Sequence, residues 1–224
     1  MVIRDFYTEV LHISDEELIE KLLAKTSIRH IPKGELLVRE GERVKNIDFL
    51  WDGILRGFFV DANGKEITDC IGVQRGSPAV SWFREDAVST INIEALEDST
   101  VISIPLGEAM EMVNQNVSLL YVYNRLLQFA LEFHWELKAV IHQYSAQQKY
   151  LWFLSRYPGL ITRVKKKYVA SFLGMSPVTL SRVRKELLET GRLEGDADSI
   201  PYSLMQDGRD GGINKSSNRH IFTW

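Results

Sequence analysis

A glycine and a proline, three residues apart, interrupt a helical stretch in the C-terminal part of the 224-residue chain. The segment KKYVASFLGMSPVTLSRVRKELL, residues 166–188, has strong helix formers at both ends and Gly174 and Pro177 in its middle. Gly174 can adopt the left-handed conformation that closes a helix. Ser176 is then the N-cap of a second helix, with Pro177 at the first position, where its missing N–H costs nothing. The segment is predicted to form two short helices joined by a turn of about three or four residues.

Cations surround these two predicted helices. Between Lys149 and Arg192 the chain has ten lysines and arginines against two glutamates, a net charge of +8. Since the whole chain carries −3, the remainder carries −11. A segregated positive segment on an acidic protein indicates phosphate binding. An ordinary helix pair with a solvated basic face is the alternative. The apolar stripes by which the pair is predicted to pack are Val169, Ala170 and Leu173 on the first helix and Leu180, Val183 and Leu187 on the second.

The early exposed side of the second helix is predicted to face DNA bases. The Arg182 guanidinium matches the two major-groove acceptors of guanine. Lys166, Lys167 and Lys185 are expected to contact phosphates instead. The full set of predicted DNA-binding residues is Lys166, Lys167, Ser176, Pro177, Val178, Thr179, Ser181, Arg182 and Lys185.

Short strand-like runs fill the N-terminal part of the chain. Ser14 and Glu17 have the spacing of a capping box, which predicts an opening helix through about Ala24. From there to about Pro105, runs such as ELLVRE, ILRGFFV and TVISIP are separated by turn signals, and DANGKE reads as a hairpin turn. The pattern predicts an antiparallel barrel or sandwich.

A long helix is predicted from about Gly107 to Gln143, and it carries two apolar rows. One row has alternating steps of four and three residues, the heptad spacing of paired helices, and is expected to face a second copy of the chain. The other row is expected to pack on the β-domain. A single helix buried on its own barrel is the alternative. The predicted dimer seam is Leu119, Tyr123, Leu126, Ala130, Phe133, Leu137, Val140 and Tyr144, and the second row is Val117, Leu120, Leu127 and Leu131.

These segments, taken in order, resemble the Crp/Fnr family of bacterial transcription regulators. YVASFLGMSPVTLSRVRKEL is similar to the helix-turn-helix of that family, whose second helix typically reads T-x-S-R, here Thr179, Ser181 and Arg182. YSAQQKYLWFLSRYPGL resembles the segment leading into the DNA-binding domain. IPKGELLVREGE, FLWDGILRGFFVDANGKEIT and IEALEDSTVISIP resemble strands and turns of the sensory β-roll. The resemblance covers roughly residues 25–190.

The resemblance implies an α+β fold in three parts. These are an antiparallel, jelly-roll-like β-roll sensor domain at residues 1–106, a dimerisation helix at 107–144, and a winged-helix-type helix-turn-helix domain at 145–224. The family usually adds a β-hairpin wing, but the last residues here are rich in Gly, Asp, Asn and Ser and read as a flexible tail. The implied function is a homodimeric regulator that binds double-stranded DNA, responds to a small-molecule effector and contacts RNA polymerase. A regulatory or protein-interaction module without specific DNA binding is the alternative.

The chain departs from the cyclic-nucleotide-binding members of the family at their ligand pocket. Those members carry a glycine–glutamate pair and, later, an arginine followed by a small residue. Gly76, Ser77 and Pro78 stand at the first place, and Ser89 and Thr90 at the second. Because the arginine and glutamate hold the phosphate and ribose, neither cyclic AMP nor cyclic GMP is expected to be the effector. An uncharged or aromatic metabolite, or no ligand, is expected instead. Arg84 lies too early to replace the arginine well, and the predicted pocket residues are Gly76, Ser77, Pro78, Ser81, Ser89, Thr90 and His134.

The remaining residues exclude several functions. Cys70 is the only cysteine, so neither a disulfide nor a four-cysteine iron–sulfur site can form within the chain. There is no nucleophile–base pair, metal-ligand cluster or phosphate loop, so no enzymatic activity, cofactor or metal is expected. The sequence shows neither a membrane-spanning apolar run nor a signal peptide, which predicts a cytoplasmic location without a membrane partner.

Overall fold

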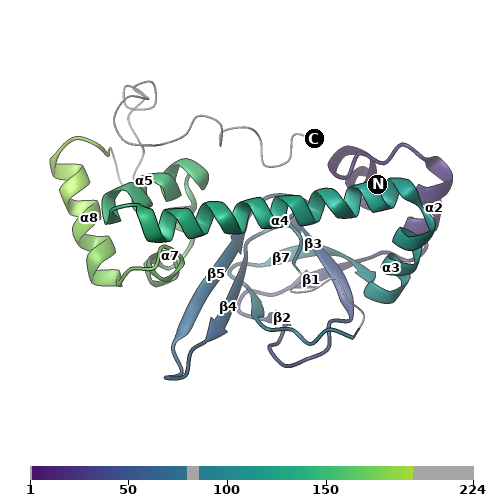
Figure 1. The fold of residues 1–224 in the computed structure, drawn as a ribbon, viewed down its shortest axis with the longest axis horizontal. Coiled ribbons are helices and arrows are strands. Elements are labelled where there is room, and N and C mark those ends of the chain that lie inside the picture. Colours follow the sequence, from purple (N-terminus) through teal and green to yellow (C-terminus); the bar gives the residue numbers. More distant parts are fainter. Residues whose placement is uncertain (1, 80–85, 194–224) are drawn as a thin grey trace. The chain divides into compact units, whose positions relative to one another are not determined.

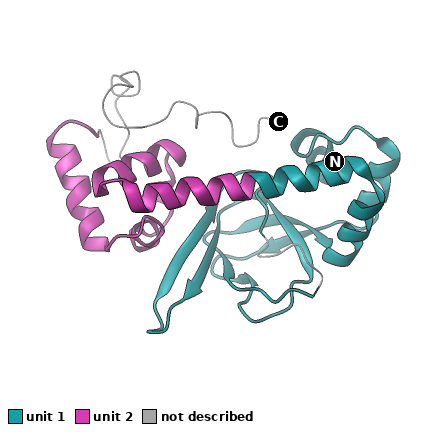
Figure 2. Cartoon of the chain, viewed as in Figure 1, with its two compact units in different colours: residues 1–128, 224 teal, residues 129–223 magenta. Residues whose placement is uncertain are grey.

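The computed structural model of the chain describes residues 2–79 and 86–193 (Figure 1). The chain divides into two compact units, residues 1–128 and residues 129–223, and the division falls within its longest helix (Figure 2). The first unit contains the strands, and the described part of the second is helical.

The first unit is a roll of two antiparallel sheets. Its strands are β1 (Ser27–Ile31), β2 (Leu36–Val38), β3 (Asn46–Asp52), β4 (Leu55–Val60), β5 (Glu66–Gly72), β6 (Asn92–Ala95) and β7 (Ser99–Pro105). One sheet has the order β1-β7-β3 and the other the order β2-β6-β4-β5. The predicted hairpin joins β4 to β5, where the Asp61 carboxylate accepts hydrogen bonds from the Asn63 and Lys65 backbone N–H groups at 2.8 and 3.0 Å. The antiparallel roll predicted from the sequence is confirmed.

The helical start of the chain is more elaborate than the sequence predicted. The opening helix is capped by Asp15, whose carboxylate accepts a hydrogen bond from the Leu18 N–H at 3.0 Å. The predicted capping box of Ser14 and Glu17 is therefore wrong by one residue, because either neighbouring side chain can serve as an N-cap. Two further segments precede this helix. The three elements are α1 (Val2–Asp5), a π-helical segment η1 (Phe6–Val10) and α2 (Glu16–Leu23).

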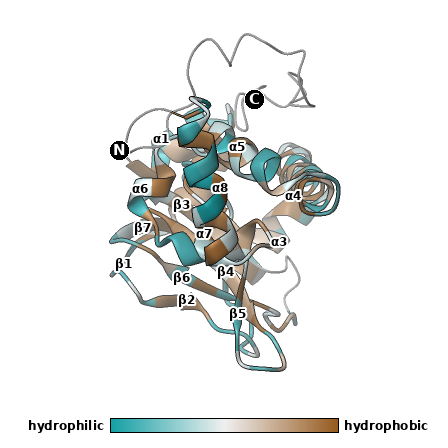
Figure 3. Cartoon of the chain, turned by 90° about the vertical axis from the view of Figure 1, so that its left-hand side faces the viewer, coloured by the Kyte–Doolittle hydropathy of each residue, from teal (hydrophilic) through white to brown (hydrophobic). Residues whose placement is uncertain are grey.

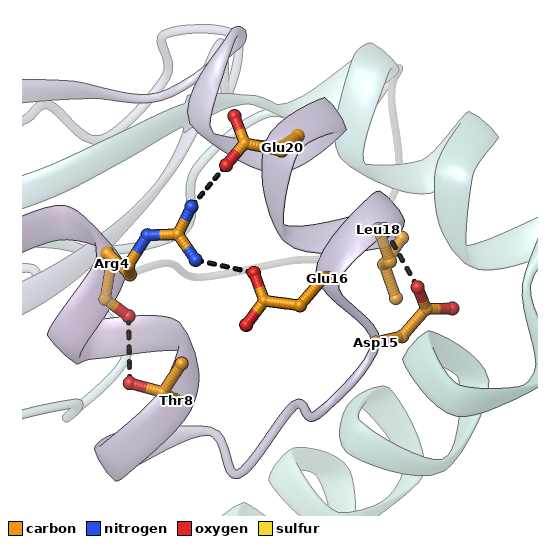
Figure 4. A network of polar contacts seen from close by, with 6 residues as sticks. All are labelled: Arg4, Thr8, Asp15, Glu16, Leu18 and Glu20. Carbon is orange, nitrogen blue, oxygen red and sulfur yellow. Dashed lines mark hydrogen bonds and ion pairs between the residues drawn. The ribbon is translucent and has the colours of Figure 1, made fainter.

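An arginine ties the first of these elements to the third. The Arg4 guanidinium forms ion pairs with Glu16, at 2.6 Å, and with Glu20 (Figure 4). Thr8 donates a hydrogen bond from its hydroxyl to the Arg4 carbonyl at 3.2 Å. Each of these side chains is at least partly exposed, so the pairs contribute little to stability but hold α1 in register with α2.

The single long helix predicted from Gly107 is two helices. They are α3 (Leu106–Gln115) and α4 (Val117–Gln143). Asn116 separates them with an extended backbone, φ −132° and ψ 118°. Its side-chain oxygen accepts hydrogen bonds from the Ser118 and Leu119 N–H groups at 2.9 and 3.2 Å. Asn116 therefore ends one helix and caps the next, a role for which asparagine is among the preferred residues.

The two apolar rows of α4 are used differently from the prediction. Leu119 and Leu126, on the predicted dimer seam, are 6% and 4% exposed and belong to the core of the first unit. Leu137 and Val140 of the same seam are also buried. These four residues are thus unavailable to a partner, and only Tyr123, Ala130, Phe133 and Tyr144 of the seam remain half-buried. The row expected to pack on the β-domain is the exposed one. Exposed apolar side chains of α4 are Val117, Leu120, Tyr121, Leu127, Leu131 and Trp135.

Two apolar clusters hold the first unit together. The interior cluster lies between the two sheets and contains buried residues from both. Its members are Ile31, Leu50, Leu55, Ala79, Ile93, Ala95 and Val101. The second cluster covers the other face of β3 and β7 with the helices, and includes Phe6, Leu18, Phe49, Ile102, Leu106, Leu119 and Leu126. Each fully buried large side chain contributes about 1.5–3 kcal/mol, so the start of α4 is anchored firmly to its own roll.

The described part of the second unit is the end of α4 followed by four helices. A cluster of aromatic rings forms its centre, with Trp152, Phe153, Tyr157 and Phe172 at centroid separations from 5.2 to 6.4 Å. Glu136 of α4 accepts a hydrogen bond from the Trp152 indole at 2.9 Å. The predicted tail, and with it any wing, lies outside the described residues. The helices are α5 (Ala146–Arg156), α6 (Leu160–Arg163), α7 (Lys166–Phe172) and α8 (Pro177–Glu189). Among the described helices, none combines the length and apolar character needed to cross a membrane.

Candidate nucleic-acid interface and sensor site

The turn between α7 and α8 has the geometry that the sequence predicted. Gly174 has φ +63°. Its N–H donates to the Ser171 carbonyl at 3.0 Å, and the Met175 N–H donates to the Ala170 carbonyl at 2.9 Å. These two bonds form a Schellman motif, which closes a helix with a left-handed residue. The Ser176 hydroxyl then accepts a hydrogen bond from the Thr179 N–H at 3.0 Å. The helix-turn-helix, with Ser176 as N-cap and Pro177 at its first position, is confirmed.

The predicted apolar stripes pack the two helices. Val169, Ala170 and Leu173 are fully buried on α7 and at its end. The α8 stripe faces them and is buried as well, at Leu180, Val183 and Leu187. Because one side of α8 is committed to this contact, the opposite side is left for solvent or a partner.

Most of the predicted DNA-binding residues of α8 are exposed on that opposite side, and much of α8 is coloured as hydrophilic in Figure 3. Val178 is 68% exposed, so its isopropyl group is accessible to a partner. Thr179 differs, because it is half-buried and its hydroxyl lies 2.9 Å from the Ser176 hydroxyl, so it completes the cap of α8 instead of facing outward. The other predicted residues on this side are exposed: Ser176, Pro177, Ser181, Arg182 and Lys185.

The cations of this surface are mostly uncompensated. No hydrogen bond or ion pair involves Arg182 within residues 2–79 and 86–193. Lys185 lies 3.6 Å from Glu189, in an exposed pair that contributes little. Lys166 and Lys167 are exposed at the start of α7, with the Lys167 ammonium 4.9 Å from the centre of the Tyr168 ring. An exposed row of cations with few acidic partners is suited to a polyanion.

The predicted sensor residues near Gly76 form part of the roll wall. Gly76 has φ +84°, and a Cβ on it would lie 2.4 Å from Val10 Cγ1 of η1. Its N–H donates to the Leu50 carbonyl at 2.8 Å, and Pro78 pairs with Phe49. The segment Gly76–Ser77–Pro78 therefore runs beside β3 as an added edge, with Gly76 required by close contact with the N-terminal segment.

The residues of the second predicted part of the pocket differ in their exposure. Ser89 is buried, and its hydroxyl donates to the Ile91 carbonyl at 2.6 Å. The same hydroxyl accepts a hydrogen bond from the Ile91 N–H at 3.3 Å, so it is engaged in a local turn, and its place in an effector pocket stays a prediction. Thr90 is exposed, and His134 is exposed on α4 in the second unit. Ser81 and Arg84 lie outside the described residues.

Two buried charged residues in the roll were missed by the sequence reasoning. Arg56 of β4 is 1% exposed. It donates to the Thr68 hydroxyl at 2.9 Å and forms ion pairs with Glu66 and Glu94 at 2.8 and 2.6 Å. Leu55 belongs to the interior cluster, so its neighbour Arg56 points to the other face of the sheet. A charged residue inside the apolar run ILRGFFV was the signal that could have revealed it.

The second of these residues is Asp48 of β3. Its carboxylate accepts hydrogen bonds from the Ser103 hydroxyl and, at 3.3 Å, from Arg29. Burial raises the pKa of Asp48, and the bonds from Ser103 and Arg29 act in the opposite direction. The described residues contain no group of three side chains that could hold a metal ion.

Comparisons with known proteins agree with this architecture. Residues 28–116 match the family model of the cyclic nucleotide-binding domain. FixK2 from Bradyrhizobium japonicum is similar with a TM-score of 0.68 and 14% identity, over 76% of this chain and 88% of FixK2. CLP from Xanthomonas campestris, described as a c-di-GMP responsive global regulator, gives 0.65 and 17%, over 83% and 98%.

A CooA mutant from Carboxydothermus hydrogenoformans is similar with a TM-score of 0.65 and 18% identity, over 85% of this chain and 87% of CooA. No curated protein matches the sequence at a significant level. The resemblance noted in the sequence is thus confirmed by the fold. With a cyclic nucleotide-binding domain match at residues 28–116 and a helix-turn-helix beyond it, the chain has the fold of the Crp/Fnr transcription regulators.

Proposed function

We propose that this chain is a homodimeric transcription regulator, not an enzyme, that binds specific DNA sequences in the cytoplasm and responds to a small molecule other than a cyclic nucleotide. The observation that carries the proposal is the exposed side of α8, the second helix of the helix-turn-helix. This side presents Ser181, Arg182 and Lys185 to solvent. Arg182 has no partner among the described residues, and its guanidinium can donate two hydrogen bonds to one guanine. RNA polymerase is the expected further partner of such a regulator.

The dimer forms through the exposed row of α4. Val117, Leu120, Leu127 and Leu131 follow one another at steps of three, seven and four residues, which fits a heptad repeat. A contiguous exposed apolar surface on a folded protein marks an interaction site, and two such helices can cover each other. A dimer places two recognition helices on half-sites about one DNA turn apart.

The effector is not a cyclic nucleotide, because the described part of the roll has no unpaired buried cation. Arg56 is its only buried cation, and Glu66 and Glu94 already hold it. A phosphate deprived of a charge-assisted partner loses roughly 1.5–3 kcal/mol. A ligand such as c-di-GMP, to which CLP is described as responsive, carries two phosphates and would likewise find no unpaired buried cation in the described part of the roll. Calorimetric titration of the full chain with cyclic AMP should show no binding at micromolar concentration, and micromolar affinity would overturn this part of the proposal.

DNA binding is tested with the full-length chain. Oligonucleotides are selected from a random library, with and without a small-molecule extract of bacterial cells to supply effectors, and affinities are measured by fluorescence anisotropy. Arg182→Ala should weaken binding to the selected sequence by about 1–3 kcal/mol and relax the preference at one position of each half-site. Lys185→Ala is the matched control, because loss of a phosphate contact weakens binding to all sequences alike. An equal loss on selected and random DNA after Arg182→Ala would contradict the base-reading role.

A further inference from the structure

Val178 is an apolar residue at the centre of a cationic and polar surface. It is 68% exposed in the first turn of α8, and Pro177, Ser181 and Arg182 beside it are also exposed. The apolar stripe that packs α8 onto α7 lies on the other side of the helix, at Leu180 and its companions. Val178 therefore contributes nothing to the described core of the second unit.

The position also gives no benefit to the helix itself. Valine has a lower helix propensity than alanine or glutamate because its β-branched side chain loses rotamer freedom. Near an N-terminus the helix dipole favours acidic side chains, and the first turn of α8 has none. An exposed valine at this place therefore adds little to the stability of the free protein, and its isopropyl group remains available to a partner.

Helix geometry places Val178 beside the predicted guanine-reading residue. Val178 and Arg182 are four residues apart, so they lie on the same face of α8. Their separation along the helix axis is about 6 Å, which corresponds to one or two base-pair steps of about 3.4 Å. Ser181, three residues after Val178 and on the side of it away from Arg182, is also exposed.

We propose that Val178 contacts the C5 methyl group of a thymine one or two base pairs from the guanine that Arg182 reads. This inference rests on the proposed function and adds the chemistry of one base in each half-site. Among the four bases, only thymine presents a methyl group in the major groove. The other base edges at this site present donors or acceptors, which an isopropyl group would strip of water without supplying a hydrogen bond. The half-site is thus read by one bidentate contact and one apolar contact.

The test removes the methyl group from the DNA and, separately, the apolar side chain from the protein. A sequence selected with the wild-type chain is synthesised with deoxyuridine in place of each thymine in turn, which deletes only the methyl group. Affinities of these oligonucleotides are measured for the wild-type chain, for Val178→Ser and for Val178→Thr. Threonine has nearly the shape of valine and keeps one methyl group, so it is the matched control.

Burial of one methyl group predicts a definite size for the effect. For the wild-type chain, one deoxyuridine in one of the two half-sites, within two base pairs of the guanine, should weaken binding about fourfold. Val178→Ser should bind the thymine-containing DNA more weakly and should no longer distinguish thymine from deoxyuridine at that position. Val178→Thr should retain part of the distinction. Deoxyuridine elsewhere in the site serves as the background.

The outcomes separate this inference from the proposed function. If specific DNA is selected but no thymine near the guanine shows a methyl effect, Val178 has another role and the inference is wrong. The same holds if Val178→Ser keeps the full methyl effect, because another residue then makes the contact. A methyl effect that disappears only in Val178→Ser supports it. If the chain selects no DNA under either condition, the proposed function fails and this inference fails with it.

Discussion

The exposed face of α4 gives the sharpest prediction about assembly. Leu127 and Leu131 are 38% and 59% exposed in the single chain, so together they leave about one leucine side chain uncovered. Covering that surface in a dimer contributes about 2 kcal/mol per protomer. In a symmetric dimer every substitution occurs twice, which brings the total to about 4 kcal/mol. Leu127→Ala with Leu131→Ala should therefore weaken dimerisation about a thousandfold and leave the stability of the β-roll nearly unchanged.

The neighbouring Leu126 provides the matched contrast. It is 4% exposed in the core of the first unit, so Leu126→Ala should lower the free energy of unfolding by about 2–5 kcal/mol. Its effect on the dimer should be small wherever the chain remains folded. Sedimentation velocity across a dilution series measures the dimer, and urea unfolding measures stability. The reasoning is refuted if the double variant of Leu127 and Leu131 stays dimeric while Leu126→Ala yields folded monomers of unchanged stability. A wild-type chain that is monomeric throughout would refute the dimer itself.

Three further predictions concern single residues. Gly174→Ala should lower the free energy of unfolding by about 1–2 kcal/mol, because φ is +63° there. A Cβ on residue 174 would also lie 3.3 Å from Ile141, and Gly191→Ala, with φ +65° and open space around it, controls for that contact. An unchanged stability of Gly174→Ala would contradict the turn. Burial raises the pKa of Cys70 to about 12. Iodoacetamide at about pH 8 should therefore alkylate the folded chain at least about a hundredfold more slowly than the urea-unfolded chain, because the thiolate is the reactive form. Similar rates for the two states would show an accessible thiolate. The pKa of Asp48 is raised on folding, so the folded state binds its proton more readily than the unfolded state. The wild type should therefore gain stability relative to Asp48→Asn as the pH falls from 7 toward about 4. Urea titrations in which the difference in unfolding free energy between the two proteins stays constant with pH would exclude this linkage.

The helix-turn-helix could be predicted from the sequence because its signals are local. Gly174, Ser176 and Pro177 each act on the few residues around them, through a backbone angle, a side-chain cap and a missing donor. Nothing distant along the chain changes those preferences. The same locality explains the small error at the start of α2, where Ser14 and Asp15 are both competent caps and their neighbours alone decide between them.

The use of the α4 faces could not be predicted in this way. Two apolar rows with similar heptad spacing run along the helix, and periodicity identifies rows without saying what covers them. The row that includes Leu119 and Leu126 is buried because helices from the first residues of the chain, with Phe6 at their centre, complete a core around β3 and β7. That core joins segments more than a hundred residues apart. The break at Asn116, where one unbroken helix was predicted, has a local signal in the sequence, since asparagine is a preferred helix cap.

The predicted sensor residues stay a prediction, because their role was assigned by position within a family pattern. Ser89 stands where an arginine is expected, but its hydroxyl is consumed by the Ile91 carbonyl two residues away. Arg56, outside the pattern, is the buried cation within residues 2–79 and 86–106 of the roll. The partners of the buried Arg56 come from other strands, β5 and β6, which only the folded chain brings together. The sequence shows only that a charged residue interrupts an apolar strand.

The balance of charge differs between the described part of the roll and the exposed side of α8, and this difference bears on the proposed roles of the two. In the described part of the roll, every buried polar side-chain atom has a partner, including the charged groups of Arg56 and Asp48. A charged ligand there would have to break existing pairs, which leaves a buried charge uncompensated at a cost of several kcal/mol. On α8 the situation is reversed, because Arg182 is exposed and has no hydrogen bond or ion pair with the part of the chain that the structure describes. This contrast supports the proposal that DNA binds at α8 and that the ligand of the roll brings little charge.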